Sequence, residues 1–322
     1  MNIKKQAALL GCSIAALCFS TAANAAECPE GFPDKPIEMW IGYSPGGLSD
    51  LVTRALASII ERQQGWTVVV LNKPGAGTSL MFAELARSPA DGYSIGVSAG
   101  PSAITSVPFS RPDNPYQPED FTYLGTAQKL DTGFAALTSA PFSNWDEMIA
   151  YAKEKGRLTV STAGADHQFF ADEVSAQEGI NMVIVPATSA ADAVTMALGG
   201  HTDMTIAGTT HLPYLRDGTM RQIFTLGATR AAFADYAPAT AELGYDFPGA
   251  DYYVYYAAPA GLDAQLTACL AGALDEAAAT DEFADVTAKF DTVPLNLGPQ
   301  GLTDFIMSDA AKFKEYFATI NQ

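Results

Sequence analysis

Short apolar runs alternate with amphipathic stretches along most of the chain. After the apolar segment IEMWIGY at 37–43, apolar residues recur at positions 48, 51, 52, 55, 56, 59 and 60. This i, i+3, i+4 spacing places them on one face of an α-helix, and Gly65 then supplies the residue type that commonly ends a helix. The pattern predicts a strand, a loop and a helix in that order.

The same unit is repeated in the rest of the chain. Uninterrupted apolar runs such as TVVVL are typical of parallel strands buried on both faces of a sheet. Further strands are expected at 67–72, 93–99, 133–139, 157–164, 181–189, 203–209 and 251–261, and further helices at 78–88, 144–156, 262–278 and 302–320. This alternation predicts an α/β protein with doubly wound sheets. Because a proline-rich stretch at 110–120 separates two such series, we expect two lobes that meet at a cleft.

Residues 1–25 have the layout of a secretory signal peptide. Lys4 and Lys5 precede an apolar run at 7–19, and Ala-Asn-Ala at 23–25 fits a cleavage site. The apolar run is too short to span a bilayer, and no later segment has about 18 uncharged apolar residues in succession. We therefore expect a mature protein that begins after this cleavage site and resides in the periplasm.

Composition adds a strong negative charge to this picture. The chain has 36 acidic and 18 basic side chains and a formal net charge of −18. Such a surface repels nucleic acid and anionic lipid, so neither is an expected partner.

The four cysteines divide into two pairs. Cys12 and Cys18 lie in the signal peptide, where Leu-Gly-Cys at 10–12 also allows a lipid-attachment site as an alternative. Cys28 and Cys269 remain, an even number in an oxidising compartment, and we expect a disulfide between them, with two unpaired thiols as the alternative. Two distant cysteines and three histidines without ligand spacing indicate no metal site, and no cofactor is expected.

The stretch GYSPG at 42–46 matches G-x-S-x-G, the nucleophile elbow of serine hydrolases. In an elbow, the N–H of the residue after the nucleophile donates to the oxyanion, but Pro45 has no N–H. Proline also restricts Ser44 to an extended conformation, away from the strained turn that an elbow requires. Ser44 is therefore not expected to be a nucleophile, and an exported serine hydrolase is kept only as an alternative function.

The glycine-rich nucleotide motifs are incomplete. A G-x-G-x-x-G match begins at Gly75 and Gly77, but Leu80 occupies the third glycine position, and G-x-x-x-x-G-K-[ST] does not occur. No nucleotide cofactor is expected.

The same loops are suited to holding an anion without reacting with it. Gly46 and Gly47 let the backbone approach a ligand closely, and the helix that follows directs its free N–H groups at that space. Residues 75–78 repeat the arrangement at the second helix, and STAGAD and PATSA supply small residues and hydroxyls at strand ends of the second lobe. None of these four loops contains Arg or Lys. Tight turns alone would also explain each glycine, but four such loops favour a cleft that binds a small anion.

Four motifs follow one another in the first third of the chain. They are P-x-K-P-I at 33–37, P-G-G-x-x-D at 45–50, V-V-V-x-N-x-P-G-A-G at 68–77, and P-D-G-Y at 89–93 with Ala90 inserted. In this order and spacing they resemble the Bug family, the substrate-binding proteins of tripartite tricarboxylate transporters. Weaker similarity continues through GTMRQIFTLGATR and APATAELGY, so the resemblance covers essentially the whole mature chain.

The resemblance implies a periplasmic-binding-protein fold with the ligand in a hinge cleft. The first lobe would contain residues 26–123 and 251–322, which end in a helix, and the second lobe residues 124–250. It also implies a monomer that binds a small organic dicarboxylate or tricarboxylate and delivers it to one large and one small membrane subunit of a transporter. Recognition would depend on backbone N–H groups, small polar residues and water. A ligand-sensing module for a signalling partner is a further alternative.

Matching motifs also imply which residues surround the ligand. The first loop contributes Ser44, Pro45, Gly46, Gly47 and Asp50, and the second Gly75, Ala76, Gly77 and Thr78, with Ser98 at the end of the third strand. The second lobe contributes Thr162, Ala163, Gly164, His167, Thr188, Ser189, Ala207 and Gly208. Asp50 is expected to orient its loop, because its charge would repel an anion.

The second lobe departs from the family pattern. The usual S-P-G-x-G followed by His-Leu is here STAGADHQFF, and the usual Y-K-G is Ala-Thr-Ser at 187–189. The particular acid is therefore not predicted. His167 is either a donor to a carboxylate or an ordinary half-buried helix residue.

Overall fold

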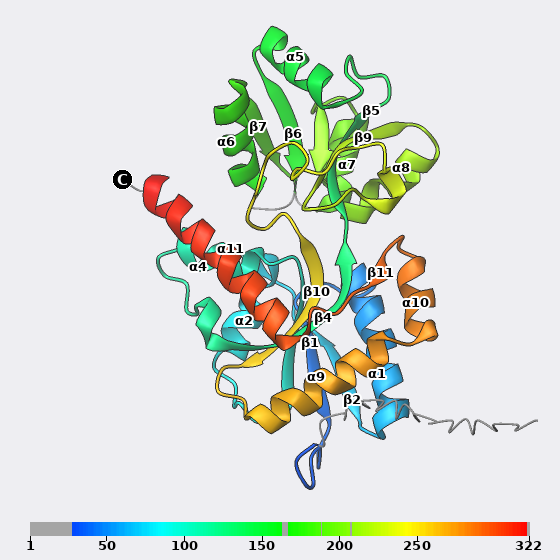
Figure 1. Ribbon diagram of the computed structural model, residues 1–322, viewed down its shortest axis with the longest axis vertical. Coiled ribbons are helices and arrows are strands. Elements are labelled where there is room, and N and C mark those ends of the chain that lie inside the picture. Colours follow the sequence, from blue (N-terminus) through cyan, green and yellow to red (C-terminus); the bar gives the residue numbers. More distant parts are fainter. Residues whose placement is uncertain (1–27, 163–166, 188, 207, 321–322) are drawn as a thin grey trace, which may run out of the picture.

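The computed structural model describes residues 28–320, apart from 163–166, 188 and 207. Two mixed sheets form the centres of two lobes (Figure 1). One has six strands in the order β11-β4-β10-β3-β1-β2, and the other has five in the order β7-β6-β8-β5-β9. The predicted two-lobed α/β fold is confirmed.

The first lobe contains the first and last elements of the described chain and the six-stranded sheet. Its strands are β1 (Ile37–Ile41), β2 (Val68–Asn72), β3 (Ser94–Ala99), β4 (Phe121–Leu130), β10 (Tyr252–Pro259) and β11 (Val293–Pro294). Its helices are α1 (Leu48–Gln64), η1 (Ala76–Thr78), α2 (Ser79–Leu85), α3 (Ser102–Thr105), α4 (Val107–Ser110), η2 (Pro118–Asp120), α9 (Ala264–Ala278), α10 (Asp281–Ala288) and α11 (Gly298–Ile320). Strand β1 pairs in parallel with β2 and β3, whereas β10 runs antiparallel to β3 and β4.

The second lobe is built on the five-stranded sheet. Its strands are β5 (Thr132–Leu137), β6 (Leu158–Thr162), β7 (Met182–Pro186), β8 (Met204–Ile206) and β9 (Met220–Leu226). Its helices are α5 (Trp145–Lys155), α6 (His167–Glu178), α7 (Ala190–Leu198), η3 (Gly208–His211), α8 (Leu212–Arg216) and η4 (Ala232–Ala234). Strand β6 is parallel to β7 and β8, and β5 is antiparallel to β8 and β9.

Helix α1 shows how the hydrophobic pattern produces local structure. Its predicted apolar face is buried at Val52, Leu56, Ile59 and Ile60. The helix ends where expected, because Gly65 adopts a left-handed conformation (φ 71°) and its N–H donates to the carbonyl of Glu61.

Strand β2 differs from its prediction. The run TVVVL was expected to be buried on both faces, but β2 pairs only with β1 and forms the edge of the sheet. Val69 is 37% exposed as a result. The strand still has apolar packing on both faces, because Val68 and Val70 pack against one core cluster and Leu71 against another.

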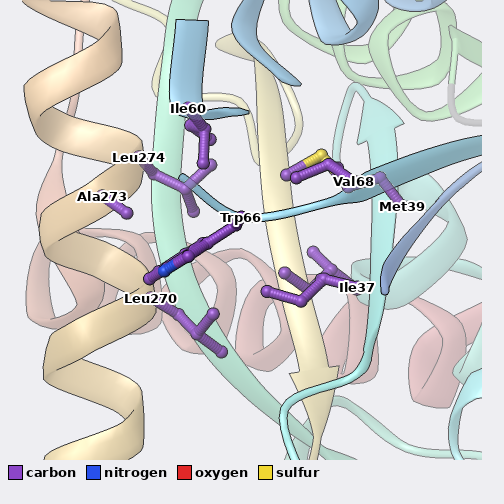
Figure 2. Close-up of a pocket in the computed structure, with 9 residues that line it drawn as sticks. Ile37, Met39, Ile60, Trp66, Val68, Leu270, Ala273 and Leu274 are labelled. Carbon is purple, nitrogen blue, oxygen red and sulfur yellow. The ribbon is translucent and has the colours of Figure 1, made fainter. Parts of the chain in front are cut away.

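The core of the first lobe lies between the sheet and helices α1 and α9. Figure 2 shows Ile37, Ile60, Trp66, Leu270 and Leu274 directed at one small void. The void measures about 10 Å³ and its lining side chains are apolar. Such a space is too small and too apolar to hold an ordered water, so it is a packing defect of the core.

Two strands carry the chain between the lobes. Strands β4 and β10 lie side by side (Figure 1), and the chain changes sheet between Leu130 and Thr132. It returns to the first sheet at Tyr252, after the segment 227–251. The residues at these changes lie beside the space between the lobes.

The C-terminal helix α11 contacts both lobes. It packs on β4 in the first lobe, and its far end reaches the second lobe (Figure 1). There the ring of Phe169 in α6 contacts the rings of Phe313 and Tyr316. Closer to the crossover strands, the buried carboxylate of Asp309 accepts a 2.6 Å hydrogen bond from the N–H of Gly249.

Cys28 and Cys269 form a disulfide that joins the start of the described chain to helix α9. In the part of the chain that the structure describes, no helix has the length and apolarity needed to cross a membrane.

Candidate functional site

A cavity of about 530 Å³ lies between the two lobes. It is bordered by loops at the carboxyl ends of strands in both sheets, the edge at which α/β proteins bind ligands. Its volume falls within the usual range for small-molecule sites, about 300–1,000 Å³. The predicted site residues that line it are Gly47, Ala76, Gly77, Thr162, His167 and Gly208.

The first loop is held in shape by Asp50, which is buried at the start of α1. Its Oδ2 accepts a 2.9 Å bond from the N–H of Gly46, and its Oδ1 accepts 3.0 Å bonds from Arg54 Nε and Asn72 Nδ2. Burial alone raises the pKa of this carboxyl, but the bonds from Arg54, Gly46 and Asn72 outweigh it, and the pKa of Asp50 is lowered. Asp50 therefore stays charged and braces the loop.

This brace changes which backbone groups can bind an anion. The N–H of Gly46 is used by Asp50. Gly47, Leu48 and Ser49 line the cleft at the start of the 17-residue helix α1, where the first N–H groups have no partner within the helix. These groups, together with the positive end of the helix dipole, favour negative charge at this point of the cleft.

The second loop has a strained backbone. Gly75, Ala76, Gly77 and Thr78 all have positive φ angles, of 149°, 48°, 61° and 74°. Residues other than glycine rarely adopt this conformation, and it costs on the order of 1–3 kcal/mol at such a residue. The two strained residues are Ala76 and Thr78, of which Ala76 borders the cleft, and strain of this kind gathers at functional sites.

Polar groups beneath the two loops tie them together. The Oγ of buried Ser98 lies 3.3 Å from Thr78 Oγ1 and 3.4 Å from the hydroxyl of Tyr43. The Tyr43 hydroxyl donates a 2.6 Å bond to the carbonyl of Ala99. Thr78 also packs so closely that a Cβ on Gly42 would lie 2.5 Å from Thr78 Cβ. Ser98 and Thr78 thus support the cleft floor from below.

On the opposite side, His167 connects the second lobe to a crossover strand. Its Nδ1 is hydrogen-bonded to Thr162 Oγ1, and its Nε2 lies 2.9 Å from the hydroxyl of Tyr252 at the start of β10. The imidazole is 5% exposed. Because both ring nitrogens are engaged, His167 holds two hydroxyls in place at the cleft wall.

The other predicted residues that the structure describes do not border the cavity. Ser44, Pro45, Gly46 and Asp50 belong to the first loop but lie outside the lining, as do Gly75, Thr78 and Ser98. Ser189 caps helix α7 by accepting a bond from the N–H of Asp192. Ala163, Gly164, Thr188 and Ala207 lie outside the described residues.

Most of the lining residues were not expected from the sequence, among them Tyr43, Arg111 and Tyr252. Tyr252 begins a strand whose other tyrosines, Tyr253, Tyr255 and Tyr256, are buried in the first lobe, so its aromatic cluster gave no reason to single it out. Arg111 belongs to the proline-rich connector, which had no recognisable motif. It is the only Asp, Glu, Lys or Arg among the described residues that line the cavity.

The hydrolase interpretation finds no support in the geometry. Ser44 is exposed, and within the described chain its hydroxyl has no hydrogen bond to a histidine. His211, the other buried histidine, is bonded to Gln222. Over the same described residues, no group of three or more His, Cys, Asp or Glu side chains is arranged to hold a metal ion.

Two α/β lobes with a cleft between their strand ends define a solute-binding protein. The chain belongs to the tripartite tricarboxylate transporter family receptor group, whose family model matches residues 52–321. Membership implies an extracytoplasmic location.

Two related proteins are similar in sequence along most of this chain. A UPF0065 protein from Cupriavidus necator is 29% identical over 287 residues, which are 88% of this chain and 86% of that protein. Protein BugT from Bordetella pertussis is 24% identical over 321 residues, 97% of this chain and 96% of that protein.

Solved structures show the same fold. A TctC solute-binding protein from Polaromonas has a TM-score of 0.77 at 20% identity, covering 89% of this chain and 99% of that one. MatC from Rhodopseudomonas palustris with bound malate has a TM-score of 0.71 at 19% identity, covering 89% and 100%. An R. palustris protein with adipate has a TM-score of 0.73 at 20% identity, covering 89% and 97%.

Proposed function

We propose that this protein is exported to the periplasm, binds a small organic carboxylate in the cleft, and delivers it to the two membrane subunits of a tripartite tricarboxylate transporter. Residues 1–25, which lie outside the described residues, would direct export and be cleaved from the exported chain. The protein acts as a monomeric binder without catalysis.

The composition of the cleft wall carries this proposal. The chain has 36 acidic side chains, yet no carboxylate lies among the described residues that line the cavity. The same wall contains the start of helix α1 and the strained loop 75–78, both of which present backbone groups to the space. Malate and adipate in structures of the same fold support an acid as the ligand.

Binding would close the cleft. The first lobe contributes Gly47 and Ala76, and the second contributes Thr162 and Gly208. A ligand that contacts both sets favours the closed arrangement by its differential affinity for it. The crossover strands β4 and β10 are the natural hinge, because the chain passes between the lobes there.

A thermal-shift screen with malate, adipate, citrate and benzoate tests the proposal. An acid present at 100 times its dissociation constant should add about 2.7 kcal/mol to the free energy of unfolding and raise the melting temperature. Failure of every acid tested in such a screen would contradict carboxylate binding. Uptake of the identified acid by cells that lack this protein, with and without the gene restored, then tests delivery.

The absence of catalysis has its own test. We expect the purified protein to show no turnover of an activated ester such as p-nitrophenyl acetate, and Ser44→Ala to change nothing, because Pro45 has no N–H for an oxyanion. Turnover in the wild type that Ser44→Ala removes would instead identify a hydrolase.

A further inference from the structure

Arg111 borders the cleft and has no ion-pair partner among the described residues. It follows helix α4, is exposed to solvent, and borders the cavity. Within the described chain, nine other Lys and Arg residues form ion pairs with carboxylates, whereas the Arg111 guanidinium has neither an ion pair nor a side-chain hydrogen bond. The protein has twice as many acidic as basic side chains, so an arginine without an ion pair is an unusual placement beside a cavity whose described lining contains no carboxylate.

The cations closest to the glycine loops in sequence are engaged elsewhere. Arg54 pairs with Asp50 and also donates to Asn72. Lys73 pairs with Glu84 and lies 3.1 Å from the centroid of the Trp40 ring. Neither residue borders the cavity, so among the described residues that line it Arg111 is the lysine or arginine that a bound anion would meet.

Much of the remaining wall is apolar. Apolar surface comes from both lobes and from the crossover strands: the side chains of Leu48, Val107, Leu130 and Ile206 and the rings of Tyr43 and Tyr252. A ligand that fills the cavity must place carbon against these side chains, since burying its polar groups there would leave them without hydrogen bonds.

We propose that Arg111 binds a second acidic group of the ligand, so that the cleft selects a diacid whose two carboxylates are separated by an apolar chain or ring. The first carboxylate lies at the backbone N–H groups of Gly47 to Ser49, and the second pairs with the guanidinium. A planar guanidinium offers a positive charge and two parallel N–H donors that match the two oxygens of a carboxylate. This inference rests on the proposed carboxylate-binding function.

The test compares acids that differ only in the second carboxylate. Adipate against hexanoate and terephthalate against benzoate are titrated calorimetrically into the wild type, Arg111→Gln, Arg111→Lys and Arg87→Gln. Arg87 is a suitable control, because it is also exposed and without an ion pair among the described residues but lies outside the cavity lining. The wild type should bind at least one diacid about ten- to hundredfold more tightly than its monoacid partner, the effect expected of a charged hydrogen-bonded pair.

Arg111→Gln should remove this preference by weakening diacid binding alone, Arg111→Lys should keep part of it, and Arg87→Gln should leave it unchanged. Equal loss of diacid and monoacid binding in Arg111→Gln, or an unchanged preference, would overturn the proposal while carboxylate binding itself stands. If only malate, citrate or the monoacids bind, selection of a diacid with an apolar chain or ring between its carboxylates is overturned in the same way. If none of these acids binds, the proposed function fails as well. Because Arg111 is exposed, unchanged melting of the free variants verifies folding in each case.

Discussion

Gly46 and Gly47 are neighbours with different tasks. Gly46 has a φ of 84°, which favours glycine, and its N–H is held by Asp50. Gly47 has φ −78° and ψ 170°, which any residue adopts, and a Cβ there would meet only the carbonyl of Ser44, at 3.8 Å. The backbone conformation therefore favours glycine at position 46. At position 47 it accepts any residue, and a side chain there would instead extend into the space beside the cavity.

This difference gives a prediction for Gly47→Val. We expect the variant to fold with a nearly unchanged melting temperature but to bind its acid about a hundredfold more weakly, because the added side chain keeps a carboxylate away from the N–H groups of α1. Calorimetric titration measures the loss. Lys73→Ala serves as the control and should change affinity little, since Lys73 is paired with Glu84. A loss in Lys73→Ala as large as that in Gly47→Val would show that ion pairing, and not the backbone, holds the acid at this loop.

At the scale of elements, helix α11 contains a carboxyl group in an unfavourable setting. Burial raises the pKa of Asp309 to about 7, with further raising by Asp251 and Asp246, while the Gly249 N–H and Lys312 act in the opposite direction. In the unfolded chain this group has its ordinary pKa near 4. Between about pH 4 and 7 the folded protein therefore binds more protons here than the unfolded chain, so this group's contribution to stability falls as pH rises through that range.

Asp309→Asn should remove this fall. We expect the variant to gain stability relative to the wild type as pH rises from 5 to 8, by on the order of 2–4 kcal/mol or a few degrees in melting temperature. Melting curves at pH 5, 6, 7 and 8 measure the trend. Asp304→Asn, at an exposed position of the same helix, should keep the wild-type pH dependence. Parallel pH profiles for Asp309→Asn and the wild type would show that Asp309 does not titrate in this range.

Helices and strands with a clear pattern of apolar residues could be predicted from the sequence, whereas elements without such a pattern could not. Helix α1 and strand β10 were expected where they lie, because a one-sided apolar face and a continuous apolar-aromatic run are local signals. Strand β4 was missed, since FTYLGTAQKL lies between two folding units and owes its pairing to β10, which is distant in sequence. The same limit applied to the site: Gly47 and His167 belong to motifs, but Arg111 reaches the cleft only through the tertiary fold.

For the whole molecule, the disulfide closes residues 28–269 into one covalent loop. Cys28 and Cys269 are 241 positions apart, and linking residues at that separation lowers the entropy of the unfolded chain. In the chain-entropy description this raises the free energy of unfolding by up to about 5 kcal/mol at 25 °C. Protein recovered from the periplasm should contain no free thiol in non-reducing mass spectrometry after alkylation. The double variant Cys28→Ser with Cys269→Ser should unfold at lower denaturant concentration but still bind acid, as both residues lie outside the cleft lining. Two alkylated cysteines in the wild type would refute the bond.

Helix α11 makes an inner and an outer contact with the residues that follow the first crossover. Its buried contact, Asp309 with Gly249, lies beside the crossover strands, whereas Tyr316 touches α6 seven residues further along, about 10 Å at 1.5 Å per residue. If the second lobe rotates while the Asp309–Gly249 contact stays intact, the outer contact at Tyr316 is displaced in proportion to its distance from that inner contact. The outer ring contacts and the bond from Tyr316 to Asp172 must then slide or break as the cleft changes width. In the proposed closure, the free energy of these contacts would enter the equilibrium between open and closed forms, and side chains on the outer surface would affect the affinity for the acid.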